Sequence, residues 1–128
     1  MAKQSDKPHT LKYEQPPLMS HSELEQEMAS GNDERIANAL LSAFYSENPE
    51  WVQKSCLRFA AHPNNQVRRN VAVVLGNVSH VYASEIDLNV SLETLQKLNT
   101  DNDASVRVAS EDAIEVVLHM MGRLKKKQ

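Results

Sequence analysis

The stretch NNQVRRNVAVVLGNV, residues 64–78, is apolar at almost every core-facing position of a helix, yet two arginines stand close to its start. The same Val-Arg step returns 39 residues later in DASVRVASEDAIEVV, residues 103–117. A recurring helical pattern predicts that these two parts of the chain share one local structure, with an arginine in the same place in each.

A third, more divergent copy of the pattern precedes these two. In each copy a residue suited to cap a helix is followed three positions later by a branched aliphatic residue and eight positions beyond that by a second large apolar one. The capping residues are Asp33, Asn64 and Asp103, and the apolar residues are Ile36, Val67 and Val106, then Phe44, Leu75 and Ile114. Periods of 31 and 39 residues predict stacked helical hairpins.

Capping and turn signals divide the chain into about six helices. We expect helices over residues 22–30, 34–44, 49–62, 66–80, 90–99 and 104–121, with Asp33 capping the second and Gly122 ending the last. We expect residues 34–44 to pair with 49–62, and residues 66–80 to pair with 90–99. Only 3 glycines are present, which disfavours a sheet protein rich in tight turns.

The pattern resembles the HEAT-repeat family, including the short bacterial HEAT-like repeats, whose signature is an Asp, then Val-Arg, then Ala- and Leu-rich positions. The likeness covers residues 21–122. It is good in the third copy, fair in the second, where Asn64 replaces the Asp, and weak in the first, where Ala37 occupies the Arg position. The resemblance implies an all-α fold, a right-handed α-α superhelix (solenoid) of about three HEAT-like hairpins.

The resemblance also implies a structural ladder made by Arg68, Arg107, Asp33 and Asp103. In this family the repeated arginine lies at the seam between repeats and meets the turn Asp of an adjacent repeat. We therefore expect Arg68 to contact Asp103 or Asp33, and Arg107 to lie near the turn of its own or the preceding repeat. Arg69, one residue further round the helix, is expected to be exposed.

Charge divides the chain into an acidic body and basic ends. Residues 20–122 hold 15 acidic and 7 basic side chains, a balance of −8, whereas residues 1–19 and 123–128 together hold 2 acidic and 7 basic ones. We interpret residues 1–19 as a flexible N-terminal arm, 20–122 as the HEAT-like repeat domain and 123–128 as a basic C-terminal tail. A single cysteine, no apolar membrane-spanning run and no secretory signal favour a cytoplasmic protein that does not contact membranes.

No catalytic or cofactor-binding motif is recognisable in the sequence. The five histidines form no i, i+4 pair with completing ligands, so we expect no metal site. Cys56 is expected to be a buried apolar residue of a helix. The sequence therefore favours a non-enzymatic protein without cofactors.

A protein-binding surface is expected on the second helix of each hairpin and on the connectors between hairpins. The candidate residues are Trp51, Lys54, Arg58, Tyr82, Glu85, Asp87, Glu93 and Lys97. The connector 82–89 is the preferred recognition element, because connectors on a repeat scaffold often face the ligand. Trp51 suits a core position as well as an interface.

Small, acidic HEAT-like proteins resemble the immunity proteins of bacterial toxin systems. An acidic inhibitor finds a cationic toxin, such as a nuclease, quickly through electrostatic steering, so we expect a basic protein partner and no nucleic acid. A generic scaffold or adaptor remains an alternative, and a basic groove or a pigment pocket would favour an enzyme of the DNA glycosylase or phycobilin lyase type. An uncovered apolar face on the last helix would favour a weak homodimer over a monomer.

Overall fold

The computed structural model describes residues 18–46 and 48–126, which are entirely helical apart from turns and contain no strand. The six α-helices are α1 (His21–Met28), α2 (Asp33–Ala43), α3 (Pro49–Arg58), α4 (Asn65–Val81), α5 (Leu88–Leu98) and α6 (Ala104–Lys126), with the 3-10 turn η1 (Ala83–Glu85) between α4 and α5. The all-α prediction is confirmed. The arm predicted over residues 1–19 lies outside the described residues except for Leu18 and Met19.

Polar side chains cap the start of each of the first five helices. Ser20 forms the predicted capping box with Glu23, and Asn64 accepts hydrogen bonds from the first turn of α4. The N-cap of α2 is Asn32, not Asp33 as predicted, because the side chain of Asn32 accepts the hydrogen bond from the first turn. These caps fix where each helix begins, and therefore how long the connecting turns are.

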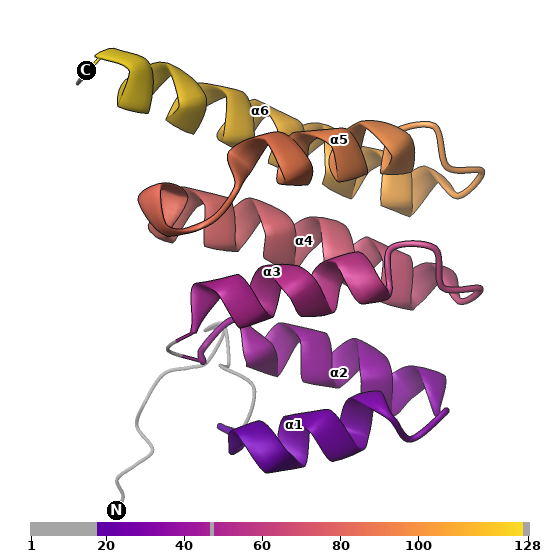
Figure 1. The fold of residues 1–128 in the computed structure, drawn as a ribbon. Coiled ribbons are helices and arrows are strands. Elements are labelled where there is room, and N and C mark those ends of the chain that lie inside the picture. Colours follow the sequence, from indigo (N-terminus) through magenta and orange to yellow (C-terminus); the bar gives the residue numbers. More distant parts are fainter. Residues whose placement is uncertain (1–17, 47, 127–128) are drawn as a thin grey trace, which may run out of the picture.

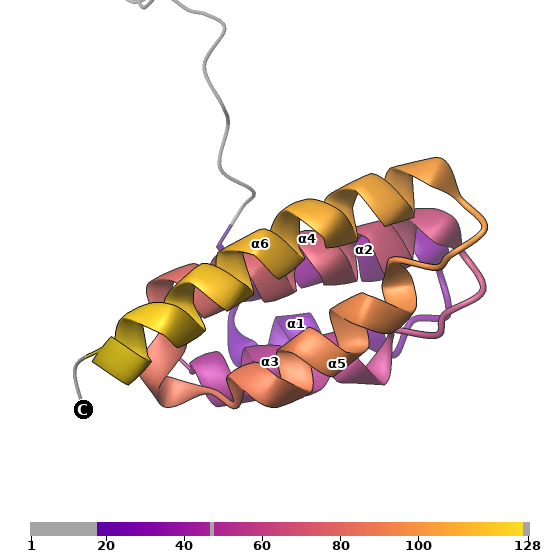
Figure 2. The same ribbon diagram turned by 90° about the horizontal axis from the view of Figure 1, so that it is seen from above.

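The helices form two layers of three (Figures 1 and 2). Helices α2, α4 and α6 lie side by side in one layer and run in the same direction, while α1, α3 and α5 form the other layer and run the opposite way. Residues 66–78 and 106–118 therefore lie next to each other and point the same way, as the repeat pattern requires. The right-handed superhelical twist stays a prediction.

The pairing of neighbouring helices differs from the prediction. Helix α3 packs more extensively on α4 than on α2, and α5 packs more extensively on α6 than on α4. The hairpins are therefore α1–α2, α3–α4 and α5–α6, each shifted by one helix from the predicted pairs. A sequence period gives the length of a repeat but not the point in the repeat where the closest pair begins.

Helix α4 forms the centre of the hydrophobic core. Its residues Val67, Val71, Val74, Leu75 and Val78 are all completely buried, between α2 on one side and α6 on the other. Each fully buried side chain of this size contributes roughly 1.5–3 kcal/mol to folding. The stability of α2 and α6 therefore depends on α4.

Two glycines of the layer α2–α4–α6 lie inside helices, one at a close contact between helices and one where a helix end was predicted. A Cβ atom on Gly76 would lie 2.9 Å from Cβ of Ala113, so glycine allows α4 and α6 to approach closely. Gly122 does not end α6, which continues to Lys126 and includes the first four residues of the predicted basic tail. Met121 and Leu124 on either side pack against the core, which offsets the modest helix cost of one glycine, about 1 kcal/mol.

The partial burial of the last helix also bears on self-association. Val117 is fully buried, and Val116 and Met120 are half-buried, because α4 and α5 both lie against α6. Val108 remains 58% exposed. The apolar face predicted to lack a cover is thus largely covered within the chain.

No helix of the described part is sufficiently long and apolar to cross a bilayer.

The contact at Gly76 predicts opposite effects for two glycine-to-alanine substitutions. Gly76→Ala lowers the free energy of unfolding, because overpacking against Ala113 costs about 1–3 kcal/mol and outweighs the helix preference of alanine. Gly122→Ala meets no atom within 4 Å and raises the free energy of unfolding by about 0.5–1 kcal/mol. Urea unfolding of both variants measures the difference, and equal shifts would contradict the close packing of α4 on α6.

Candidate protein-binding surfaces

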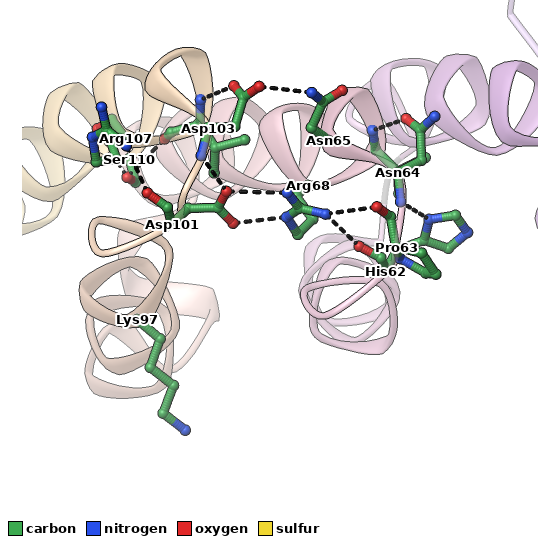
Figure 3. Close-up of polar contacts among 12 residues, drawn as sticks. His62, Pro63, Asn64, Asn65, Arg68, Lys97, Asp101, Asp103, Arg107 and Ser110 are labelled. Atoms are coloured by element: carbon green, nitrogen blue, oxygen red, sulfur yellow. Dashed lines mark hydrogen bonds and ion pairs between the residues drawn. The ribbon is translucent and has the colours of Figure 1, made fainter.

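Arg68 joins two neighbouring hairpins at one edge of the molecule (Figure 3). Its Nε donates to Oδ2 of Asp101 at 2.7 Å and its Nη2 donates to Oδ1 at 3.0 Å, which makes a bidentate ion pair. Its Nη1 donates to the carbonyl oxygens of His62 and Pro63 at 2.8 and 2.9 Å. The α3–α4 turn is thereby tied to the α5–α6 turn. The Arg68 and Asp101 side chains are only 15% and 11% exposed, so water screens the pair weakly.

The predicted partner of Arg68 was wrong, because Asp101 takes the place expected for Asp103 or Asp33. Asp103 uses Oδ1 to accept hydrogen bonds from the backbone of Ser105 and Val106, which caps α6. Its Oδ2 accepts a hydrogen bond from Asn65 at 2.6 Å. The turn sequence TDND offers two aspartates, and capping α6 occupies the second one.

The other members of the predicted ladder make shorter-range contacts. Arg107 donates from Nη1 to the carbonyl oxygen of Asp101 at 2.8 Å, which places it at the turn of its own hairpin, one of the two expected positions. Asp33 accepts a hydrogen bond from Nδ2 of Asn64 at 3.1 Å. Where the first copy has Ala37 in place of arginine, the buried Asn70 donates to the Ala37 carbonyl at 2.8 Å and ties α4 to α2. We call this edge, from Asp33 through Arg68 to Arg107, the seam edge.

Hydrogen bonding along the seam edge changes the ionisation of its carboxylates. The hydrogen bonds from the Arg68 guanidinium to the Asp101 carboxylate lower the pKa of Asp101. The same hydrogen bonds raise the pKa of Arg68. The Ser105 hydroxyl is the main group that lowers the pKa of Asp103. Both carboxylates are therefore committed to holding the turns together.

Trp51 and Arg58 are also engaged inside the molecule. Nε1 of Trp51 donates to Oε2 of Glu25 at 3.2 Å, and the half-buried indole ring lies 4.4 Å from the ring of His21. Arg58 contacts the other oxygen of Glu25 at 3.4 Å. Both side chains thus hold α1 against α3, and a partner would have to share or replace these contacts.

The remaining candidates divide into structural and exposed residues. Tyr82 is the half-buried C-cap of α4, and Asp87 is the N-cap of α5, accepting hydrogen bonds from the backbone of Asn89 and Val90. Lys54, Glu85 and Glu93 are exposed, as is Lys97, which points away from the seam edge (Figure 3).

Cys56 is fully buried, and burial raises the pKa of its thiol far above the ordinary range, so it is unreactive.

The edge opposite the seam carries a continuous depression around the connector between α4 and α5. It consists of hollows of about 1000, 520 and 380 Å³, and neighbouring hollows share lining residues. The largest hollow, at one end, is mainly apolar and also carries Lys125. The two smaller hollows, at the other end, carry Glu50 and Glu85, with Lys54 beside them. We call this depression the connector trough, and its principal residues are Glu50, Ser84, Glu85, Ile86, Asp87, Leu118 and Met121.

A second groove runs over the layer formed by α2, α4 and α6. Hollows of about 820 and 650 Å³ share Arg69, Val73 and Asn77, which recur every fourth residue on one face of α4. Arg69 is half-buried rather than exposed as predicted, and it donates to Oδ1 of Asn70 at 3.4 Å. The spacing of these three residues could have indicated the groove from the sequence.

The described residues contain no group of three His, Cys, Asp or Glu side chains that could hold a metal ion.

The seam predicts unequal costs for removing its two arginines. Arg68→Ala leaves Asp101 without its cation and lowers the free energy of unfolding by about 2–3 kcal/mol, because breaking a mostly buried pair leaves a charge uncompensated. Arg107→Ala removes one hydrogen bond at an exposed position, and its effect is much smaller. Urea unfolding at neutral pH compares the two. Equal losses would mean that Arg68 does not hold the hairpins together.

The lowered pKa of Asp101 also predicts a pH dependence of stability. The pair contributes fully above the ordinary carboxyl pKa of about 3.9, and its contribution is lost as the pH falls through the lower pKa of the folded state. Wild type should therefore exceed Asp101→Asn in stability by a constant amount near neutral pH, and the gap should shrink below about pH 4. Urea unfolding at several pH values tests this, and a gap independent of pH would exclude an ionised Asp101 as its source.

The fold is shared with a chain of known structure. The fold is similar to one chain of a crystal structure of a CDI complex from Cupriavidus taiwanensis, with a TM-score of 0.72 and 27% sequence identity. The match covers 87% of this chain and 98% of that chain. No protein-family model and no curated protein matches the sequence. The similarity extends over nearly the whole of the other chain, so it concerns the complete stack and not a single hairpin.

Proposed function

We propose that this protein is an immunity protein that binds and neutralises a toxin. The observation that carries the proposal is the similarity, over nearly its whole length, to a chain from a CDI complex. CDI denotes contact-dependent inhibition, in which a toxin is matched by an immunity protein. The proposal includes a short HEAT-like solenoid as the scaffold and a cytoplasmic site of action.

The charge of the chain supports the immunity role over that of the toxin. Residues 20–122 carry 15 acidic and 7 basic side chains. A toxin that acts on nucleic acid needs a cationic surface, and an acidic inhibitor is attracted to such a surface over a long range. We therefore propose a basic toxin domain, such as a nuclease, as the partner.

The same distribution of charge disfavours the enzymatic alternatives. A DNA glycosylase needs a basic groove with aromatic side chains to hold a flipped base. In the groove over α2, α4 and α6, Asp33, Glu34 and Asp112 outnumber the one arginine, Arg69. A phycobilin lyase would need an enclosed pigment pocket, and the hollows described above are open at the surface. A generic adaptor remains the second candidate.

Co-expression tests the proposal directly. The protein encoded by the reading frame next to that of this chain is taken as the candidate toxin and is expressed in a bacterial host, alone and together with this protein. We expect the toxin alone to stop growth and co-expression to restore it, with a 1:1 complex in native mass spectrometry. An adaptor would bind without restoring growth, and failure to bind or to restore growth would exclude the immunity role.

A further inference from the structure

We propose that the connector trough is the surface on which the toxin docks. The toxin segment that fits it places an apolar side chain between Ile86, Leu118 and Met121 and a cationic side chain beside Glu50 and Glu85. This inference rests on the proposed function and names the contact surface and the chemistry of the segment.

The position of the trough separates it from the residues that hold the fold together. The turns of the seam edge use their charged groups for internal contacts, as in the pair of Arg68 with Asp101. The connector, the start of α3 and the C-terminal part of α6 lie at the opposite edge (Figure 1). A partner can therefore approach this edge without breaking the contacts between hairpins.

The apolar end of the trough is formed where α6 passes the connector. Leu118 is 51% exposed, and Ile86 and Met121 are half-buried beside it. The hollow exists because α6 continues through Gly122 and carries Leu124 and Lys125 past the start of α5. An apolar side chain seated here would remove Leu118 from water, which favours association through the hydrophobic effect.

The acidic end of the trough is complementary to a cation. Glu50 and Glu85 line the two smaller hollows together, and both side chains are exposed. Among residues 18–46 and 48–126, neither carboxylate has an ion-pair partner, although the exposed Lys54 lines the larger of these two hollows with them. A cationic group of a toxin would gain two unpaired carboxylates at one place.

The connector is held rigidly by a buried glutamine. Gln53 of α3 donates from Nε2 to the carbonyl oxygen of Asp87 at 2.8 Å and to Oγ of Ser91 at 2.9 Å. Its Oε1 accepts a hydrogen bond from the backbone N–H of Asp87 at 3.3 Å. The short turn η1 and the start of α5 are thus fixed on α3 before any partner binds. A preformed surface loses little conformational entropy on binding, which favours this connector over a loose loop.

Two substitutions in the trough and two matched controls test the proposal. Glu85→Lys reverses a charge in the trough, and Glu111→Lys makes the same change on the exposed surface of α6 outside both depressions. Leu118→Ser removes the apolar contact, and Val108→Ser does the same at a 58% exposed position in the groove between α4 and α6. Asp87 is left intact because it caps α5. The probe is the toxin domain from the co-expression experiment, and its binding is followed by surface plasmon resonance.

We expect Glu85→Lys to slow association about tenfold at low salt, and Glu111→Lys to change it less than about twofold. Leu118→Ser should speed dissociation about tenfold or more, while Val108→Ser leaves it unchanged. The melting temperatures of all four variants should stay close to that of the wild type, since the positions are exposed.

Three other outcomes are distinguishable. If the wild type binds and neutralises the toxin but Val108→Ser alone weakens the complex, the toxin docks in the groove over α2, α4 and α6, and the trough proposal is overturned while the immunity role stands. If the wild type binds and neutralises the toxin and none of the four variants changes binding, the trough proposal is likewise overturned and the immunity role stands. If the wild type neither binds nor neutralises the toxin, both proposals fail.

Discussion

The structure depends on the fact that no helix pair of this chain can bury its apolar face alone. The central helix α4 places Val71 and Val74 in complete burial, which requires α2 on one side and α6 on the other. Apolar packing supplies most of the stability but is poorly directional. Polar contacts therefore set the register between hairpins, and the bidentate pair of Arg68 with Asp101 is the least exposed ion pair of the described residues.

Polar contacts between hairpins are made mainly by charged side chains at one edge of the stack, so the two edges have different properties. At the seam edge, turn carboxylates and arginines are consumed by capping and by contacts between turns, as for Asp103 and Arg68. At the opposite edge, the connector is fixed by contacts of its backbone to Gln53, and the carboxylate of Glu85 forms no ion pair within the described part of the chain. The proposed recognition surface follows from this asymmetry, because rigid backbone and free charge occur together there.

The sequence predicted the helices well because capping residues and apolar spacing act locally. It predicted tertiary polar partners poorly, because these depend on which of several similar groups is already occupied. Asp101 and Asp103 are equivalent as sequence, and only the cap on α6 leaves Asp101 free for Arg68. Trp51 likewise could have faced a partner or the core, and Glu25 on α1 decided its orientation.

The helices that pair most closely differ from the predicted pairs. A repeat pattern is the same wherever the repeat is said to begin, so the sequence could not tell that α3 packs chiefly on α4. The shift leaves the surface candidates Lys54, Glu93 and Lys97 on the expected helices α3 and α5, which lie in one layer with α1 (Figure 2). The groove around Arg69 on the layer of α2, α4 and α6 was not predicted, although the spacing of Arg69, Val73 and Asn77 on one face of α4 could have indicated it.

Amide hydrogen exchange with and without the bound toxin domain tests the central claim most directly, because it reads both edges in one measurement. We expect the turns at residues 62–65 and 100–103 to be protected in the free protein and unchanged in the complex. We expect new protection on binding over residues 83–89 and 118–125. New protection confined to α2 and the exposed face of α4, with the connector unchanged, would contradict it.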